Sequence, residues 1–114
     1  MKNWIVPQFQ RSLTKRPSEE VKIACDFSEK LLPYFGKINS ADFSAEKWLV
    51  SDPDLKLPGD EILERSSIEI EAPYLTQAKI LVAGGEVNYD YHVTCVAHTD
   101  DGQIFEQDFF VRIK

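Results

Sequence analysis

The sequence has few of the residues from which catalytic and metal sites are built: two cysteines, two histidines and five glycines in 114 residues. It contains no Cys-x-x-Cys pair, no Gly-x-Ser-x-Gly motif and no glycine-rich loop that could cradle a phosphate. No apolar run approaches the roughly 18–20 residues that a membrane helix needs. The chain also reaches Pro7 before the core of a signal peptide could form. These absences predict a protein that is not an enzyme, binds no cofactor and contacts no membrane, and that lies in a cytoplasm with reduced thiols.

A chain of 114 residues has the size of one domain. Hydrophobic residues make up 43% and charged residues 28% of it, which argues against disorder, collagen and coiled coil. The net charge of −6 disfavours nucleic-acid binding, because binding to phosphates requires a basic surface. The sign is uneven, since residues 1–16 contain four basic residues and no acid. We therefore predict a basic N-terminal arm over residues 1–16 and a single domain over residues 17–114.

Short runs of alternating apolar and polar residues follow the arm. In residues 21–27, Ile23 and Cys25 fall on one face of a strand, and Lys22 falls on the other. The same pattern predicts further strands at 67–71, 77–83, 89–99 and 104–114, with 38–43 and 47–51 forming one strand or a bent pair. We expect a helical turn at 28–32 and a loop at 52–60 with a brief edge strand around Leu55 and Leu57. The fold class predicted is all-β, an immunoglobulin-like β-sandwich of about seven short antiparallel strands.

The register of the last hairpin follows from its turn. Residues 99–103 suit a three-residue loop, a type I turn followed by Gly102 in the left-handed region. A two-residue loop would shift the register by one and bury charged residues instead of apolar ones. The favoured loop sets these core-like residues opposite each other: Ala97 and Phe105, Val93 and Phe109, Tyr91 and Val111, and Tyr89 and Ile113. On the other face it sets Asp90 beside Arg112 and His92 beside Phe110.

Histidine, cysteine and acidic side chains show no catalytic or metal-binding spacing. His92 and His98 share one face of a strand but lie about 20 Å apart along it, too far to share a metal ion. Cys25 and Cys95 point inward with Trp48 between them in sequence, the order found in immunoglobulin domains. We interpret them as two buried thiols, with a disulfide as the alternative. The acids at 52–61 and 100–101 fit turns and lack the spacing of a calcium loop, so we predict no metal site.

Three segments taken in order resemble a known family. The first is Cys-Asp-Phe-Ser at 25–28, followed by Gly-Lys-Ile-Asn-Ser-Ala at 36–41. The second is Leu-Val-Ala-Gly-Gly at 81–85, and the third is the strand and turn at 91–102. Trp-Leu-Val at 48–50 matches a further strand of the same family pattern. Together they resemble the small bacteriophage and prophage proteins described as fibre-tail adaptors, over about residues 17–114. Where that family usually has another glycine before the tyrosine strand, this chain has Asn88, which can also adopt a left-handed conformation. The resemblance implies a virion structural protein made in the bacterial cytoplasm, with no catalytic residues to transfer.

Two groups of residues are predicted to form an interface: Trp4, Ile5, Phe9 and Arg11 in the arm, and His92 and Phe110 in the domain. We expect the arm to order against a neighbouring chain or over an edge of its own sandwich. His92 and Phe110 form an apolar patch beside Val96 and Ile104 on the outward face of the last two strands.

The function predicted is therefore that of a non-enzymatic phage or prophage structural protein. It would link tail and fibre, or other tail or neck components, as a homo-oligomer or a component of an assembly. The alternative is an immunoglobulin-like binding module that recognises a glycan or a protein.

Overall fold

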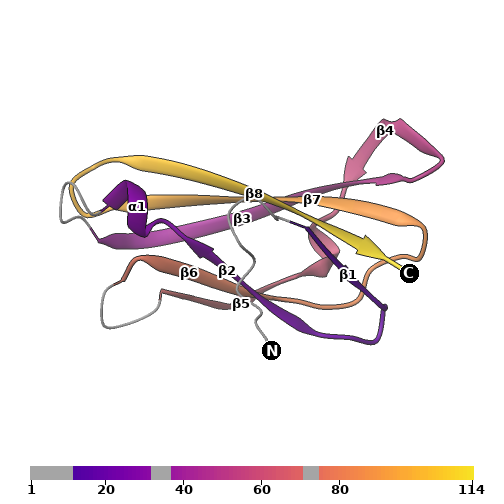
Figure 1. Cartoon of the computed structure of the whole chain (residues 1–114), viewed down its shortest axis with the longest axis horizontal. Helices are drawn as coiled ribbons and strands as arrows, with labels where there is room; N and C mark the ends of the chain where they lie inside the picture. The colour runs from indigo at the N-terminus through magenta and orange to yellow at the C-terminus, as the bar shows by residue number, and fades with distance from the viewer. Residues whose placement is uncertain (1–11, 32–36, 71–74) are drawn as a thin grey trace.

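In the described residues, the alternating segments form eight strands in two sheets that pack face to face (Figure 1). The computed structural model describes residues 12–31, 37–70 and 75–114. The five-stranded sheet has the order β1 (Ser12–Lys15), β8 (Ile104–Ile113), β7 (Tyr89–Thr99), β3 (Ile38–Leu49) and β4 (Asp52–Pro58). The three-stranded sheet has the order β2 (Val21–Asp26), β6 (Gln77–Val82) and β5 (Leu63–Ile70). A single helical turn, α1 (Ser28–Leu31), and a 3₁₀ turn, η2 (Asp60–Ile62), complete the described part of the chain.

The strand order is that of an immunoglobulin sandwich. If β2 to β8 are lettered B, C, C′, D, E, F and G, one sheet reads B-E-D and the other G-F-C-C′. The all-β sandwich predicted from the sequence is confirmed. Strands β2 to β8 are the roughly seven antiparallel strands that were predicted. The described residues add one more strand, β1, which pairs with β8 in parallel, with Ser12 opposite Phe110 and Lys15 opposite Ile113.

Residues 52–58 form a strand where we predicted mostly loop. β3 is one continuous strand of 12 residues, and from Glu46 to Leu49 it pairs with β7 along one edge, which leaves its other edge open to a second neighbour. β4 supplies that neighbour through pairs such as Glu46 with Pro58 and Leu49 with Asp52, separated by a register shift. Prolines and aspartates are tolerated here because β4 is an edge strand.

The hairpin of β7 and β8 has the predicted register. Gly102 has a φ of 86°, and the Thr99 N–H donates to the Gln103 carbonyl oxygen at 3.0 Å, which closes the three-residue loop. The ladder includes these predicted pairs: Ala97 and Phe105, Val93 and Phe109, Tyr91 and Val111, His92 and Phe110, and Asp90 and Arg112. It ends at Asp90 and Arg112, one pair short of the predicted Tyr89 and Ile113. The turn therefore determines which residues of both strands enter the core.

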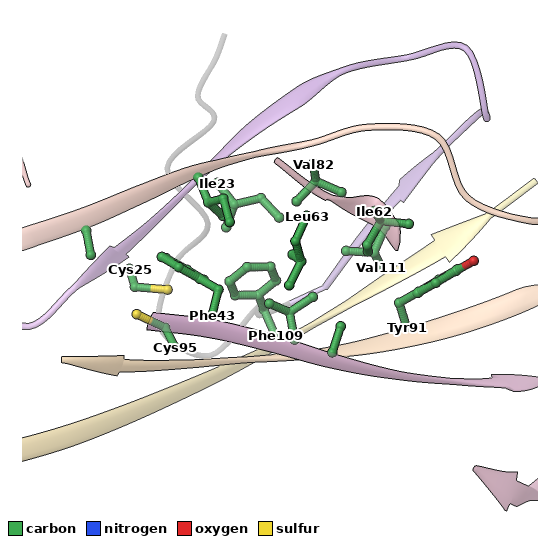
Figure 2. Close-up of a cluster of buried hydrophobic side chains, with 14 of the residues drawn as sticks. Ile23, Cys25, Phe43, Ile62, Leu63, Val82, Tyr91, Cys95, Phe109 and Val111 are labelled. Atoms are coloured by element: carbon green, nitrogen blue, oxygen red, sulfur yellow. The ribbon is translucent and has the colours of Figure 1, made fainter. Parts of the chain in front are cut away.

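The core lies between the sheets and includes both cysteines (Figure 2). Cys25 on β2 and Cys95 on β7 are 1% and 0% exposed, are free thiols, and point toward each other. A hydrogen bond with Cys25 and burial raise the pKa of the Cys95 thiol above its ordinary value. Phe43, the register partner of Cys95, packs in the core beside them, whereas Trp48 lies on the outward face of β3. The interpretation as two buried thiols is confirmed.

One stretch of the predicted arm, residues 12–15, forms β1. Lys15 at its end is 2% exposed, and its Nζ donates to the carbonyl oxygens of Arg16 at 2.7 Å and Gly84 at 2.5 Å. Burial lowers the pKa of Lys15. These bonds anchor β1 to the loop between β6 and β7. The arm residues predicted for the interface, Trp4, Ile5, Phe9 and Arg11, lie outside the described residues.

Candidate protein interface on the five-stranded sheet

The outward face of the five-stranded sheet carries a row of side chains that crosses all five strands. The register places Ser12 of β1 beside Phe110 of β8, and Phe110 beside His92 of β7. His92 lies beside Glu46 of β3, which lies beside Pro58 of β4. These residues point outward because their neighbours along each strand, such as Tyr91 and Val111, point into the core. The predicted residues His92 and Phe110 are therefore adjacent and at the middle of this face.

Three rings form an ordered group on this face, which we call the aromatic cluster: Trp48, His92 and Phe110. Phe110 stacks on His92 with ring centroids 4.8 Å apart and an interplanar angle of 15°. Trp48 meets Phe110 edge-on, with centroids 6.5 Å apart at 69°. Phe110 is 43% exposed, and Trp48 and His92 are half-buried. The cluster is a partly exposed, ordered aromatic surface of the kind enriched at protein interfaces.

Charged residues hold the aromatic cluster in place. Lys56 Nζ of β4 lies 4.1 Å from the centroid of the Trp48 ring, a cation–π contact. His92 Nε2 lies 3.2 Å from Asp108 Oδ1, and Thr94 donates to the same oxygen at 3.0 Å. These contacts restrict the rotamers of the rings, so less conformational entropy is lost when a partner binds.

The predicted pair of Asp90 and Arg112 lies next to the cluster. Arg112 donates to both carboxylate oxygens of Asp90, at 2.7 and 2.8 Å. This pairing raises the pKa of Arg112. With Ser12, Leu13, Thr14 and Phe110, the pair lines a shallow hollow of about 380 Å³ beside β1. The hollow is open and polar, and its described lining residues offer a contact surface.

The outward face of the three-stranded sheet differs in character. In the described parts of β2, β5 and β6 there is no aromatic residue. Lys22 and Glu69 form an exposed ion pair there at 3.2 Å. Such mixed charge is typical of a solvated face. Of the two outward faces, the one that carries the aromatic cluster is therefore the better candidate for an interface.

Sequence reasoning missed a second polar cluster, which lies at one end of the sandwich and includes Lys47, Glu61, Glu86 and Tyr91. Lys47 Nζ donates to Glu61 at 2.6 Å and also to Glu86. Tyr91 Oη donates to Glu61 Oε2 at 2.9 Å and accepts the Glu86 backbone N–H at 3.0 Å. The only sequence signal was a tyrosine near the start of a late strand, where immunoglobulin-like domains place a tyrosine that caps a corner.

The pKa values of Lys47, Glu61 and Tyr91 in this cluster are shifted away from neutral pH. Hydrogen bonds to Glu61 and Glu86 raise the pKa of Lys47. Burial acts to raise the pKa of Glu61, but hydrogen bonds from Lys47, its own backbone and Tyr91 hold it below its ordinary value. Burial raises the pKa of Tyr91 to about 12. Lys47, Glu61 and Tyr91 therefore each keep one protonation state near pH 7, as expected of structural groups rather than of a general acid or base.

The described residues contain neither a cluster of side chains suited to a metal ion nor a helix that could span a membrane. No group of three or more histidine, cysteine, aspartate and glutamate side chains there is arranged to hold a metal ion. No helix in the described part of the chain is long and apolar enough to cross a membrane.

A family model described as "Podophage GP4 fiber-tail adaptor protein gp77" matches residues 15–112. No curated protein matches the chain. The family match runs from Lys15, the last residue of β1, to Arg112, one residue before the end of β8, and covers every strand between them. Asn88, expected to replace a family glycine, has a φ of 74°, in the left-handed region. The resemblance found in the sequence is thereby confirmed, and the chain belongs to the podophage fiber-tail adaptor family of phage structural proteins.

Proposed function

We propose that this protein is a non-enzymatic adaptor that joins phage tail and fibre components through protein–protein contacts. Its main contact surface is the outward face of the five-stranded sheet. The observation that carries the proposal is the aromatic cluster, in which Phe110 is exposed and Trp48 is half-buried, and in which ring and cation–π contacts hold both in fixed orientations. Exposed aromatics with restricted rotamers are the residues that supply most of the binding energy at interfaces.

The charge of the same face supports protein partners rather than nucleic acid. Five carboxylates point outward from β3, β7 and β8: Asp42, Glu46, Asp90, Glu106 and Asp108. A phosphate backbone would be repelled by this surface. A protein segment of opposite charge would be attracted to it.

A flat sugar ring fits the face less well than a protein segment does. Glycan sites commonly use a free aromatic face as a platform, but Lys56 covers one face of Trp48 and His92 covers one face of Phe110. Together with the family match, this favours the adaptor over a glycan-binding module.

The arm residues Trp4, Ile5, Phe9 and Arg11 belong to the proposed interface as well. They combine positive charge with apolar surface, and β1 begins directly after them at the edge of the same sheet. We place the protein first in the bacterial cytoplasm, where the chain folds, and then in the virion, as a homo-oligomer or a component of an assembly.

The test is incorporation into phage particles. A phage lacking this gene is complemented with wild-type protein, with Trp48→Ala, with Phe110→Ala or with Leu81→Ala, a control on the outward side of the other sheet. We expect both aromatic variants to fold and to enter particles at least about tenfold less, because each removes an interface anchor. Leu81→Ala should enter normally. Normal incorporation of both aromatic variants would overturn the proposal.

A further inference from the structure

We propose that the aromatic cluster and the acids around it bind residues 1–11 of a second copy of this chain. This inference rests on the proposed function, because it names a partner for the same face. It follows from three features: the unbalanced charge of the face, the composition of residues 1–11, and the point at which that segment joins the sheet.

The face has more negative charge than it can pair. In the described part of the chain, this sheet contributes two permanent cations to the face, Lys56 and Arg112, against the five outward carboxylates of β3, β7 and β8. Arg112 is engaged by Asp90, and Arg65 reaches Asp42 from the other sheet at 4.0 Å. Among the described residues, Glu46 and Glu106 have no ion-pair partner, and both are exposed. The surface around the rings is thus acidic and incompletely paired.

Residues 1–11 have the complementary chemistry. They contain Lys2 and Arg11 and no acidic residue, and the apolar Trp4, Ile5 and Phe9 lie between these two cations. Arginine and aromatic side chains are the residues most enriched at interface centres. A segment of this kind can place its rings on the aromatic cluster and its cations beside Glu46 and Glu106.

Length and attachment favour a segment that comes from another copy. Eleven extended residues span up to about 36 Å, whereas five strands are about 19 Å wide from first to last. The segment can therefore cross the whole face. Ser12, however, is the register partner of Phe110 and lies in the plane of the sheet. The segment of the same chain would have to bend sharply at Arg11 to lie over the rings, whereas the segment of a second copy can approach from the open side of the face.

The charge complementarity is tested by reversal in the full chain. Self-association is measured by sedimentation velocity at low and high salt for the wild type, for the face variant Glu46→Lys/Glu106→Lys and for the arm variant Lys2→Glu/Arg11→Glu. We expect each double reversal to weaken self-association by about tenfold or more. We also expect high salt to weaken the self-association of the wild type, because salt screens the attraction between the charges. Combining all four substitutions should restore it to within about threefold of the wild type.

A matched control makes the same charge change elsewhere. Glu64→Lys/Glu69→Lys adds the same charge to the outward side of β5, and it should leave self-association unchanged. Equal weakening by this control, or failure of the combined variant to recover, would overturn the inference, because the effect would then come from net charge alone.

The origin of the segment is tested by mixing copies. The Asn3→Cys variant, without ¹⁵N, receives a nitroxide at position 3, and the native cysteines do not react with the label because both are buried. This protein is then mixed with ¹⁵N-labelled wild type. Binding between copies predicts broadening of the amide signals of Glu46, His92 and Phe110 in the labelled copies. A second sample carries the nitroxide and ¹⁵N in the same molecule. Broadening in this sample alone would show that the face binds residues 1–11 of its own chain, and it would overturn the inference. No broadening in either sample would overturn it as well.

Failure of this inference is distinguishable from failure of the proposed function. If Trp48→Ala and Phe110→Ala are excluded from particles while the charge reversals leave self-association unchanged, the face binds a different partner and only this inference falls. If the aromatic variants enter particles normally, the proposed function itself falls.

Discussion

Tyr91 and Glu61 are joined across one end of the sandwich by a hydrogen bond of 2.9 Å between Oη and Oε2. Tyr91 belongs to β7 and is 0% exposed, while Glu61 belongs to η2, which leads into β5 of the other sheet. The same phenolic oxygen accepts the Glu86 N–H. One side chain therefore connects both sheets with the loop that precedes its own strand.

Replacing Tyr91 by phenylalanine should lower the free energy of unfolding by about 1–3 kcal/mol, because the Glu86 N–H and the Glu61 carboxylate both lose the hydrogen bond to the hydroxyl of this buried side chain. Urea denaturation measures the change. Tyr89→Phe is the matched control, since among the described residues the Tyr89 hydroxyl has no hydrogen bond in the structure. Similar effects of the two substitutions would contradict the role assigned to Tyr91.

Glu61 should make stability depend on pH on the acid side. Its pKa is held below the ordinary 4.5, so its carboxylate stabilises the fold above that pH, and the contribution is lost as the pH falls through the lowered value. Equilibrium unfolding between about pH 6 and pH 3 should show a steeper loss for the wild type than for Glu61→Gln. Glu64→Gln, an exposed control on β5, should retain the wild-type slope. A slope unaffected by Glu61→Gln would refute the assignment.

Alanine substitutions at Gly84 and Gly85 distinguish the cost of backbone strain from the cost of a steric clash. Both have positive φ, 70° and 106°, so alanine is strained at either position. A Cβ on Gly84 would meet nothing within 4 Å, whereas one on Gly85 would lie 2.6 Å from Ile113 Cδ1 in the core. We expect Gly84→Ala to cost about 1 kcal/mol and Gly85→Ala about 1–3 kcal/mol more. Thermal and urea unfolding of the two variants compare them directly, and equal losses would show that Ile113 gives way without cost.

Cys25 and Cys95 should resist modification in the folded protein. Burial suppresses access and raises the pKa of the Cys95 thiol, which lowers the thiolate fraction. An aromatic disulfide reagent added to native protein should therefore release almost no coloured product, and two equivalents should appear after addition of guanidinium. Rapid reaction of either thiol under native conditions would show that the sandwich opens locally near the pair.

The local pattern was enough to predict the arrangement of the last hairpin. Apolar alternation in Tyr89–Thr99 and Ile104–Ile113, with Gly102 between them, permits only one register that buries apolar residues. The inward position of Cys25 and Cys95 and the outward position of His92 and Phe110 follow from the same period of two. The sandwich, the hairpin and part of the candidate interface were therefore predictable without coordinates.

Tertiary structure alone decided the parallel addition of β1, the pairing of β4 and the cluster of Lys47, Glu61, Glu86 and Tyr91. The bonds from Lys47 and Tyr91 to Glu61 join residues 14 and 30 positions apart, and β1 pairs with β8 from the other end of the described chain, so these groups meet only in the folded sandwich. β4 follows β3 closely in sequence, but its register, with a shift between Lys47 and Leu49, is set only in the folded sheet. The same holds for Trp48, whose contact with Phe110 joins two strands that are not adjacent in the sheet. Periodicity determines which way a side chain points, but which distant side chain it then meets depends on strand order and on the register between strands.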